Sequence, residues 1–196
     1  MKLLPLDTPE SIGLVAEWLG REDDYKWLDF GEGVGALSAL SLKLMTQRDR
    51  HVLRLFTPDD SDLPIGLVAL SDVRLLWKTA GSVWTVLGRK RFGGYACRAV
   101  SMLLTFGFRE LGLEAVSAWT VEHNHASRRI LEQLGFRYIG RQRRRHWMDG
   151  RPYDRLLYDL LASEHRELPD GSPAVTLMRP PHLPTPGPLR LADSAG

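Results

Sequence analysis

The chain has 196 residues, with a hydrophobic fraction of 43% and a charged fraction of 26%, which are the values of a soluble globular domain. No apolar run approaches the ~18 residues of a membrane span, and the N-terminal segment turns polar too early for a signal peptide, so we expect a cytoplasmic protein with no membrane partner. The net charge of +2 is too small to indicate nucleic-acid binding by itself.

Hydrophobic periodicity predicts alternating strands and helices in the first half of the chain. We expect an edge strand over 1–7, a helix over 9–19 capped by Thr8, a loop over 21–35, a helix over 37–47, and strands over 51–56, 65–75 and 82–87.

The second half predicts a helix over 96–111, a strand over 115–121, a helix from Asn124 to Gly135, and strands over 136–147 and 153–161. Asp149-Gly150 between the last two strands is a strong hairpin signal. This order indicates an α/β (α+β) domain over 1–165, with a mostly antiparallel sheet and helices on both faces. Residues 166–196, which are rich in proline, are predicted to form a disordered or polyproline-like tail.

Cys97 is the only cysteine, which excludes an internal disulfide and a cysteine-based zinc site, and no metal is expected. Because Cys97 lies at the start of the helix over 96–111, it can be interpreted either as a nucleophile or as a small core residue, and the core interpretation is simpler.

The junction between the strand at 82–87 and the helix from 96 is the most informative stretch. Between them lies a basic loop, Gly88 to Gly94, which carries Arg89, Lys90 and Arg91. Glycines let the backbone approach a ligand, and the free N–H groups of a helix N-terminus bind anions. The loop lacks the Lys-Ser/Thr ending of a P-loop and the first two glycines of a dinucleotide fingerprint. The pattern therefore predicts another phosphate or pyrophosphate ligand.

Three segments of the chain resemble one family. Arg91-Phe92-Gly93-Gly94-Tyr95-Ala96 fits R/Q-x-x-G-x-G/A, and Asn124 to Phe136 fits N-x-x-S/A…GF. The turn over 149–154 and the strand after it are the third shared piece. In this order they resemble the GCN5-related N-acetyltransferases (GNAT), closest to the branch that acetylates ribosomal-protein N-termini at alanine or serine.

This resemblance implies a GNAT fold with about seven strands, splayed at the coenzyme site, and about four helices. It also implies transfer of acetyl from acetyl-CoA to a primary amine, on a protein N-terminus or a small molecule. The implied coenzyme site comprises the backbone of Phe92, Gly93, Gly94, Tyr95 and Ala96 with the charge of Arg91 for the pyrophosphate, Val86 and Leu87 for the pantetheine arm and the oxyanion, and Asn124 for the pantetheine region.

The resemblance also implies catalytic positions. Many members place a tyrosine proton donor where this chain has Leu131, but Ser127 matches the serine proposed for that role in the ribosomal-protein branch. A first-turn helix serine is the alternative interpretation. The branch's glutamate base aligns with His146, which suits proton removal near neutral pH; a strand histidine without a chemical role is the alternative. His123, Glu122, Tyr138 and a water relay are weaker candidates.

Other interpretations stay open. In a strand, Arg141, Arg143 and Arg145 face one way, and Gln142, Arg144 and His146 the other. This charge is interpreted first as a solvated face, then as a site for an acidic protein substrate, and last as an RNA site for an acetyltransferase acting on aminoacyl-tRNA. A non-catalytic acyl-CoA-binding or interaction domain is a further alternative. Trp84, Trp119 and Trp147 either line an acceptor pocket or belong to the core. A homodimer is common in the family.

Overall fold

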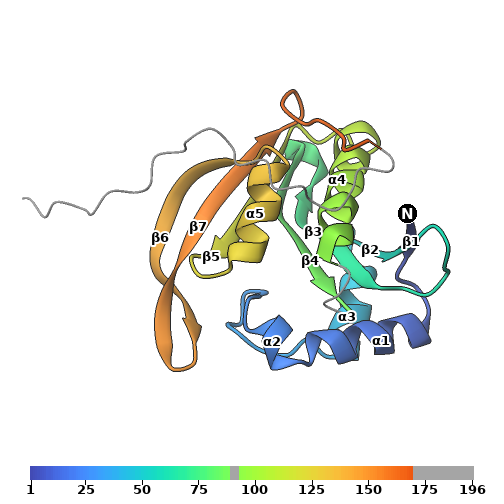
Figure 1. Ribbon diagram of the computed structural model, residues 1–196, viewed down its shortest axis with the longest axis horizontal. Coiled ribbons are helices and arrows are strands. Elements are labelled where there is room, and N and C mark those ends of the chain that lie inside the picture. Colours follow the sequence, from blue (N-terminus) through green and yellow to red (C-terminus); the bar gives the residue numbers. More distant parts are fainter. Residues whose placement is uncertain (89–92, 170–196) are drawn as a thin grey trace, which may run out of the picture.

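The computed structural model describes residues 1–88 and 93–169. In this part of the chain, seven strands form one mixed sheet in the order β1-β2-β3-β4-β5-β7-β6 (Figure 1). The strands are β1 (Lys2–Pro5), β2 (His51–Thr57), β3 (Gly66–Arg74), β4 (Thr79–Leu87), β5 (Ala115–Val121), β6 (Arg137–Met148) and β7 (Arg151–Leu161). The predicted fold class is therefore confirmed, and every strand expected from the sequence is present.

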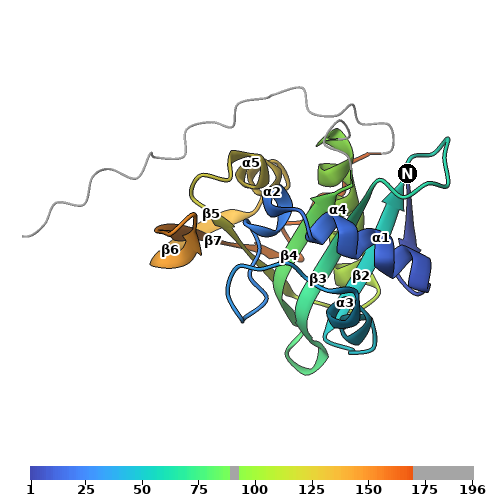
Figure 2. The same ribbon diagram turned by 90° about the horizontal axis from the view of Figure 1, so that it is seen from below.

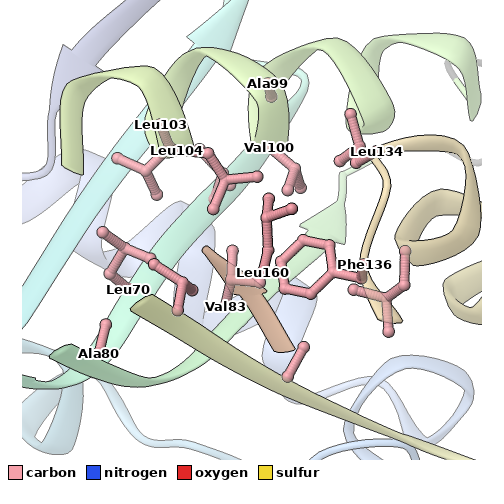
Figure 3. Close-up of a cluster of buried hydrophobic side chains, with 14 of the residues drawn as sticks. Leu70, Ala80, Val83, Ala99, Val100, Leu103, Leu104, Leu134, Phe136 and Leu160 are labelled. Atoms are coloured by element: carbon pink, nitrogen blue, oxygen red, sulfur yellow. The ribbon is translucent and has the colours of Figure 1, made fainter. Parts of the chain in front are cut away.

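Helices cover both faces of the sheet. They are α1 (Pro9–Leu19), α2 (Glu22–Tyr25), α3 (Ala39–Thr46), α4 (Gly93–Arg109) and α5 (His125–Gln133). Successive side chains of a strand point to opposite faces, so β3 contributes Val68 and Leu70 to one core and Leu67 and Ala69 to another. In the first core, Val83 of β4 packs with Val100, Leu103 and Leu104 of α4 (Figure 3). In the second core, α1 and α3 cover the opposite face.

The sheet splits between its two central parallel strands. β4 and β5 pair only at Thr79–Ala115 and Ala80–Val116, and beyond these two positions they diverge (Figure 1). The strands β3 and β7 continue to pair with the outer edges of β4 and β5. The splay that the resemblance implied is therefore present, and it leaves a gap bordered by two strand edges.

Several element bounds differ from the sequence prediction; β4, for example, begins at Thr79 and not at residue 82. Residues 22–25, expected as loop, form the short helix α2, whose first turn carries three acidic residues that suit a helix N-terminus. Arg21, just before α2, adds an ion pair to this turn: its Nε lies 2.8 Å from Asp24 Oδ2. Helix α4 begins at Gly93 instead of residue 96, so the glycine motif itself enters the helix.

The expected alternation of side chains along β6 is wrong. The ladder with β7 passes from Gln142–Arg155 directly to His146–Tyr153, so three residues of β6 stand opposite one residue of β7. Arg144 has a φ of 52°, and its N–H donates to Asp154 Oδ1 at 2.8 Å. This bulge exposes residues 143–145 together while His146 is fully buried. Such bulges redirect a side chain by disrupting the ladder.

The C-terminal segment stays packed on α4 beyond the expected domain boundary at residue 165. Leu168 N–H donates to Ser101 Oγ at 3.0 Å, and His165 Nε2 lies 2.8 Å from Thr105 Oγ1. The predicted tail falls mainly on residues 170–196, which lie outside the described residues. In the described part of the chain, no helix combines the length and the apolar character needed to cross a membrane.

Gly88 holds the end of β4 against α1. A Cβ at this position would lie 2.5 Å from two atoms of the buried Trp18 indole. We expect Gly88→Ala to lower the free energy of unfolding by about 1–3 kcal/mol, because overpacking displaces a rigid ring. Urea unfolding of both proteins measures this difference.

Gly13→Ala in α1 is the matched control, because no atom lies within 4 Å of its added Cβ. In a helix interior this change should stabilise by about 0.5–1 kcal/mol. Equal unfolding midpoints for Gly88→Ala and the unmodified protein would contradict the packing assignment.

Candidate functional site

A cavity of about 1030 Å³ opens where β4 and β5 diverge. Five of the predicted site residues line it: Val86, Leu87, Ala96, Asn124 and Ser127. Trp84 and Trp119, two of the three tryptophans considered for an acceptor pocket, also line it. Trp147 lies on β6 with 59% of its surface exposed and is not part of this lining.

The end of β4 presents backbone groups to the gap. Gly88 N–H donates to Ile65 O at 2.8 Å, toward the β3 side of the strand. Because hydrogen-bonding directions alternate along a strand, Val86 faces β3 and Leu87 faces the gap. Arg21, in the turn between α1 and α2, supports this orientation. Its Nη2 donates to Leu87 O and its Nη1 donates to Gly88 O, both at 2.9 Å. Of the two strand residues expected to meet the coenzyme, Leu87 therefore has the suitable backbone.

The N-terminus of α4 lies directly after the glycine loop. Arg91 and Phe92, two of the predicted pyrophosphate residues, lie outside the described residues. Gly93, Gly94, Tyr95 and Ala96 form the first turn of α4, and the leading N–H groups of a helix point out of its N-terminal end. Because Ala96 lines the cavity, the positive end of the helix dipole lies beside it.

Helix α5 begins at the opposite side of the gap. Asn124 Oδ1 caps the helix by accepting from Ser127 N–H at 3.1 Å. The Ser127 hydroxyl makes no hydrogen bond with any other described residue, and Leu131 is buried. The cap satisfies only the Asn124 oxygen, so its amide N–H groups and the Ser127 hydroxyl stay available at the cavity wall.

A loop after α2 bridges the two diverging strands. Asp29 Oδ2 pairs with Arg155 Nη2 of β7 at 2.5 Å, and Arg155 lies over the ring of Trp119 of β5, 4.0 Å from its centroid. The next residue, Phe30, packs edge-on against Trp84 of β4 with ring centroids 5.1 Å apart. Figure 2 shows this loop crossing in front of β4 and β3 on its way to α3. The loop therefore covers the gap on the side opposite α4.

Local hydrogen bonds fix Asp29. Its Oδ1 accepts from Gly31 N–H at 2.7 Å and from Gly33 N–H at 3.0 Å, and both glycines have positive φ. Burial raises the pKa of Asp29, but these N–H donors and Arg155 outweigh burial and hold its pKa below the usual value. Asp29 is therefore a charged structural residue.

His146 lies behind the cavity wall. It is fully buried, and its Nε2 lies 2.7 Å from Lys26 O; because a carbonyl only accepts, Nε2 carries the proton. Nδ1 then has the lone pair, and it faces Arg155 Nη2 at 3.4 Å. Burial lowers the pKa of His146, and Arg155 adds to this effect. This geometry favours a positioning role for His146 over the predicted role as base, because neither ring nitrogen faces the cavity.

Three other candidate residues, Glu122, His123 and Cys97, are held by contacts within the fold. Glu122 Oε1 accepts from Asp154 N–H at 3.0 Å, and the His123 ring lies against Tyr153. Cys97 is buried, and burial raises its pKa to about 11, so it is a core thiol. Among residues 1–88 and 93–169, no group of three or more His, Cys, Asp or Glu side chains is placed to hold a metal ion.

The sequence analysis missed the Asp29–Arg155 pair and the loop that it anchors. The pair joins residues 126 positions apart, which no local pattern specifies. The spacing of Asp29, Gly31 and Gly33 was the available signal, because an Asp followed by glycines is typical of a side-chain-capped turn. It indicates a rigid loop but does not indicate the partner.

Sequence comparison defines the class of protein. A family model described as "Acetyltransferase (GNAT) domain" matches residues 5–137. The chain therefore belongs to the GNAT acetyltransferase family.

Individual relatives agree with this assignment. An uncharacterized N-acetyltransferase of Bacillus subtilis, YoaA, is 34% identical over 68 residues, which are 35% of this chain and 38% of the relative. The match thus spans well under half the length of that curated relative.

Solved structures share the fold. Spermidine N-acetyltransferase from Vibrio cholerae, in complex with CoA and spermine, has a TM-score of 0.70 and 16% identity, covering 83% of this chain and 96% of its own. RimJ of Mycobacterium smegmatis, in complex with CoA-disulfide, has a TM-score of 0.67 and 20% identity, covering 83% and 82% respectively. At these identities the matches show a shared fold, and the ribosomal-protein branch stays a prediction.

One buried and two half-buried histidines predict how stability depends on pH. His146, His51 and His165 all have pKa values lowered from 6.5 by burial. Between the folded and unfolded pKa values the unfolded chain binds more protons, so stability is complete above pH 6.5 and decreases as the pH falls below it. We expect the free energy of unfolding to decrease from pH 7 to pH 5, measured by urea titration at each pH.

His146→Gln should flatten this slope, because one of the three groups no longer titrates. Gln keeps a donor for Lys26 O, so the variant tests protonation and not only packing. The same slope in the variant would show that His146 does not contribute to the pH dependence.

The buried ion pair predicts a second stability effect. The Arg155 and Asp29 side chains are only 9% and 10% exposed. Arg155→Leu leaves a buried carboxylate without its partner, which typically costs about 3–5 kcal/mol. Urea unfolding measures this loss in the free energy of unfolding, and Arg143→Leu in the exposed bulge is the control. Equal losses for the two variants would contradict the assigned role of the pair.

Proposed function

We propose that this chain transfers acetyl from acetyl-CoA to a primary amine by direct attack in a ternary complex. The observation that carries the proposal is the cavity between the diverging strands β4 and β5, with the Leu87 backbone on one wall and the α4 N-terminus beside it. Membership in the GNAT family supplies the reaction class. The acceptor is an amine on a peptide N-terminus or a small molecule.

In this proposal the coenzyme pyrophosphate binds the N–H groups at the start of α4. Phe92, Gly93, Gly94, Tyr95 and Ala96 supply the backbone, and Arg91 supplies charge. The absence of a side chain at Gly94 lets the phosphates approach the helix. The pantetheine arm follows the edge of β4 at Leu87 toward Asn124.

The chemistry follows from these positions. The amine nitrogen attacks the thioester carbonyl carbon, and the carbonyl oxygen becomes an oxyanion that the Leu87 N–H stabilises; one such donor is typically worth about 3 kcal/mol. The nitrogen then loses a proton to a water molecule, the C–S bond breaks, the acetyl group stays on the nitrogen, and the coenzyme leaves as a thiolate. The Ser127 hydroxyl donates a hydrogen bond or proton to this thiolate.

The acceptor must enter as a neutral amine. An α-amine has a pKa of about 7.7–8.0, so a substantial fraction is neutral at slightly alkaline pH without a strong base. The buried position of His146 agrees with a reaction that does not use it directly. A homodimer and the absence of a nucleic-acid partner stay predictions.

Titration calorimetry tests the coenzyme site. We expect micromolar binding of acetyl-CoA to the unmodified protein and none to Gly94→Glu, because the added side chain and charge oppose the pyrophosphate. Gly13→Glu, in an open position on α1, is the control and should bind normally. No binding to the folded protein would overturn the proposal.

Ser127→Ala tests the leaving-group step. We expect kcat on an Ala-led peptide to fall by about ten- to a hundredfold with little change in coenzyme affinity, in the lower range of proton-transfer contributions. An unchanged kcat would remove Ser127 from the mechanism. Coenzyme binding without turnover on any amine would support a non-catalytic acyl-CoA-binding domain.

A further inference from the structure

The cavity extends well beyond the place of acetyl transfer. Besides the walls at Leu87 and Ser127, its lining includes Ser71, Ser82, Arg48 and His51. Ser82 precedes Leu87 by five residues on β4, which corresponds to about 17 Å along a strand. The cavity is therefore elongated along β4, and we call it a channel whose ends are at Leu87 and at Ser82.

The end at the strand gap is acidic and aromatic. Asp24 of α2 and Asp29 and Glu32 of the covering loop line the cavity here, together with Trp84 and Trp119. Asp24 pairs with Arg21 and Asp29 with Arg155, while Glu32 is exposed and forms no ion pair with a described residue. The unpaired negative charge of Glu32 attracts an ammonium group to this end of the cavity.

The far end has excess positive charge. Arg50 and Arg74 share the single carboxylate of Asp72, so this group of three retains one positive charge. Arg48 is exposed and pairs with no carboxylate of the described residues. The guanidinium groups of Arg48 and Arg50 are therefore placed to bind an anionic ligand at this end of the channel.

A hydrogen-bond chain prepares a neutral donor at the same end. Trp84 Nε1–H donates to Ser71 Oγ at 2.9 Å, and Ser71 Oγ lies 3.2 Å from His51 Nδ1. Burial lowers the pKa of His51, as do Arg48 and Arg50, against the opposing effect of Asp72. Nδ1 of the neutral ring accepts a hydrogen bond from the Ser71 hydroxyl, and the ring proton is then on Nε2. The Nε2–H can then donate to an anionic ligand beside Arg48.

We propose that the acceptor is a short acidic peptide whose N-terminal amine lies at the strand gap and whose carboxylate binds Arg48 and His51. This inference rests on the proposed function of the same cavity. An extended peptide advances about 3.3 Å per residue, so a span of about 17 Å places the carboxylate on the fourth or fifth residue. An acceptor with a second ammonium group at that distance would meet repulsion from Arg48.

Matched peptides test the charge preference. We would compare Ala-Gly-Gly-Gly-Asp-Gly-amide with its Asn and Lys counterparts, measuring coenzyme A release. We expect kcat/KM to fall about tenfold from Asp to Asn and further to Lys, mainly through KM, since a charge-assisted hydrogen bond is lost away from the reacting atoms. Ala-Gly-Gly-Gly-Gly with a free terminus shows whether a main-chain carboxylate serves equally.

Arg48→Glu should reverse the order, so that the Lys peptide becomes better than the Asp peptide. Lys43→Glu, an exposed residue of the same segment that does not line this cavity, should keep the original order. Acetyl-CoA affinity should be unchanged in both variants, which shows that each is folded and that the coenzyme site is intact.

The two proposals fail separately. Equal kcat/KM for the Asp, Asn and Lys peptides, or no turnover of any peptide while spermidine is acetylated, would overturn the acidic-peptide inference and leave acetyl transfer standing. Coenzyme binding with no turnover of any amine, peptides and spermidine included, would overturn both.

Discussion

The limited pairing between β4 and β5 is the constraint on which the site depends. Two parallel strands that pair at only two positions leave backbone groups without a strand partner along the rest of their facing edges, and only some of these, such as Leu87 O, are bound by a side chain. Buried or half-buried backbone groups without partners are costly. A ligand that fills the gap and pairs with the Leu87 edge therefore has a stabilisation available that the protein alone cannot obtain.

The loop after α2 determines how this gap is closed. Asp29 and Phe30 are adjacent in sequence but contact opposite sides of the gap, Arg155 over Trp119 and Trp84 respectively. A buried ion pair has a large desolvation cost and is often no better than an apolar pair for stability. Its value here is in geometry, because it fixes one loop position relative to two strands that no longer pair with each other.

The sequence predicted elements with strong local signals. Thr8 with Pro9, and Asn124, mark helix starts through capping chemistry, and Asp149-Gly150 marks a hairpin through residues that tolerate positive φ. Such signals concern neighbours a few positions apart. The bulge at 143–145 has no such signal, because it follows from how β6 matches β7 around Asp154.

The same distinction applies to the site. The glycine motif and Asn124 with Ser127 could be placed from the sequence because each sits at a helix start whose backbone chemistry is local. The burial of His146 could not, since it depends on Lys26 and Arg155 from two distant segments. A motif alignment assigned His146 a position on its strand, while the bulge before it determined which way the ring points.

The covering loop and the far end of the channel are linked through β4. Trp84 contacts Phe30 of the loop with its ring and donates through Nε1–H to Ser71, which in turn faces His51. Trp84 is therefore a side chain that contacts both the covering loop and the hydrogen-bonded pair of Ser71 and His51.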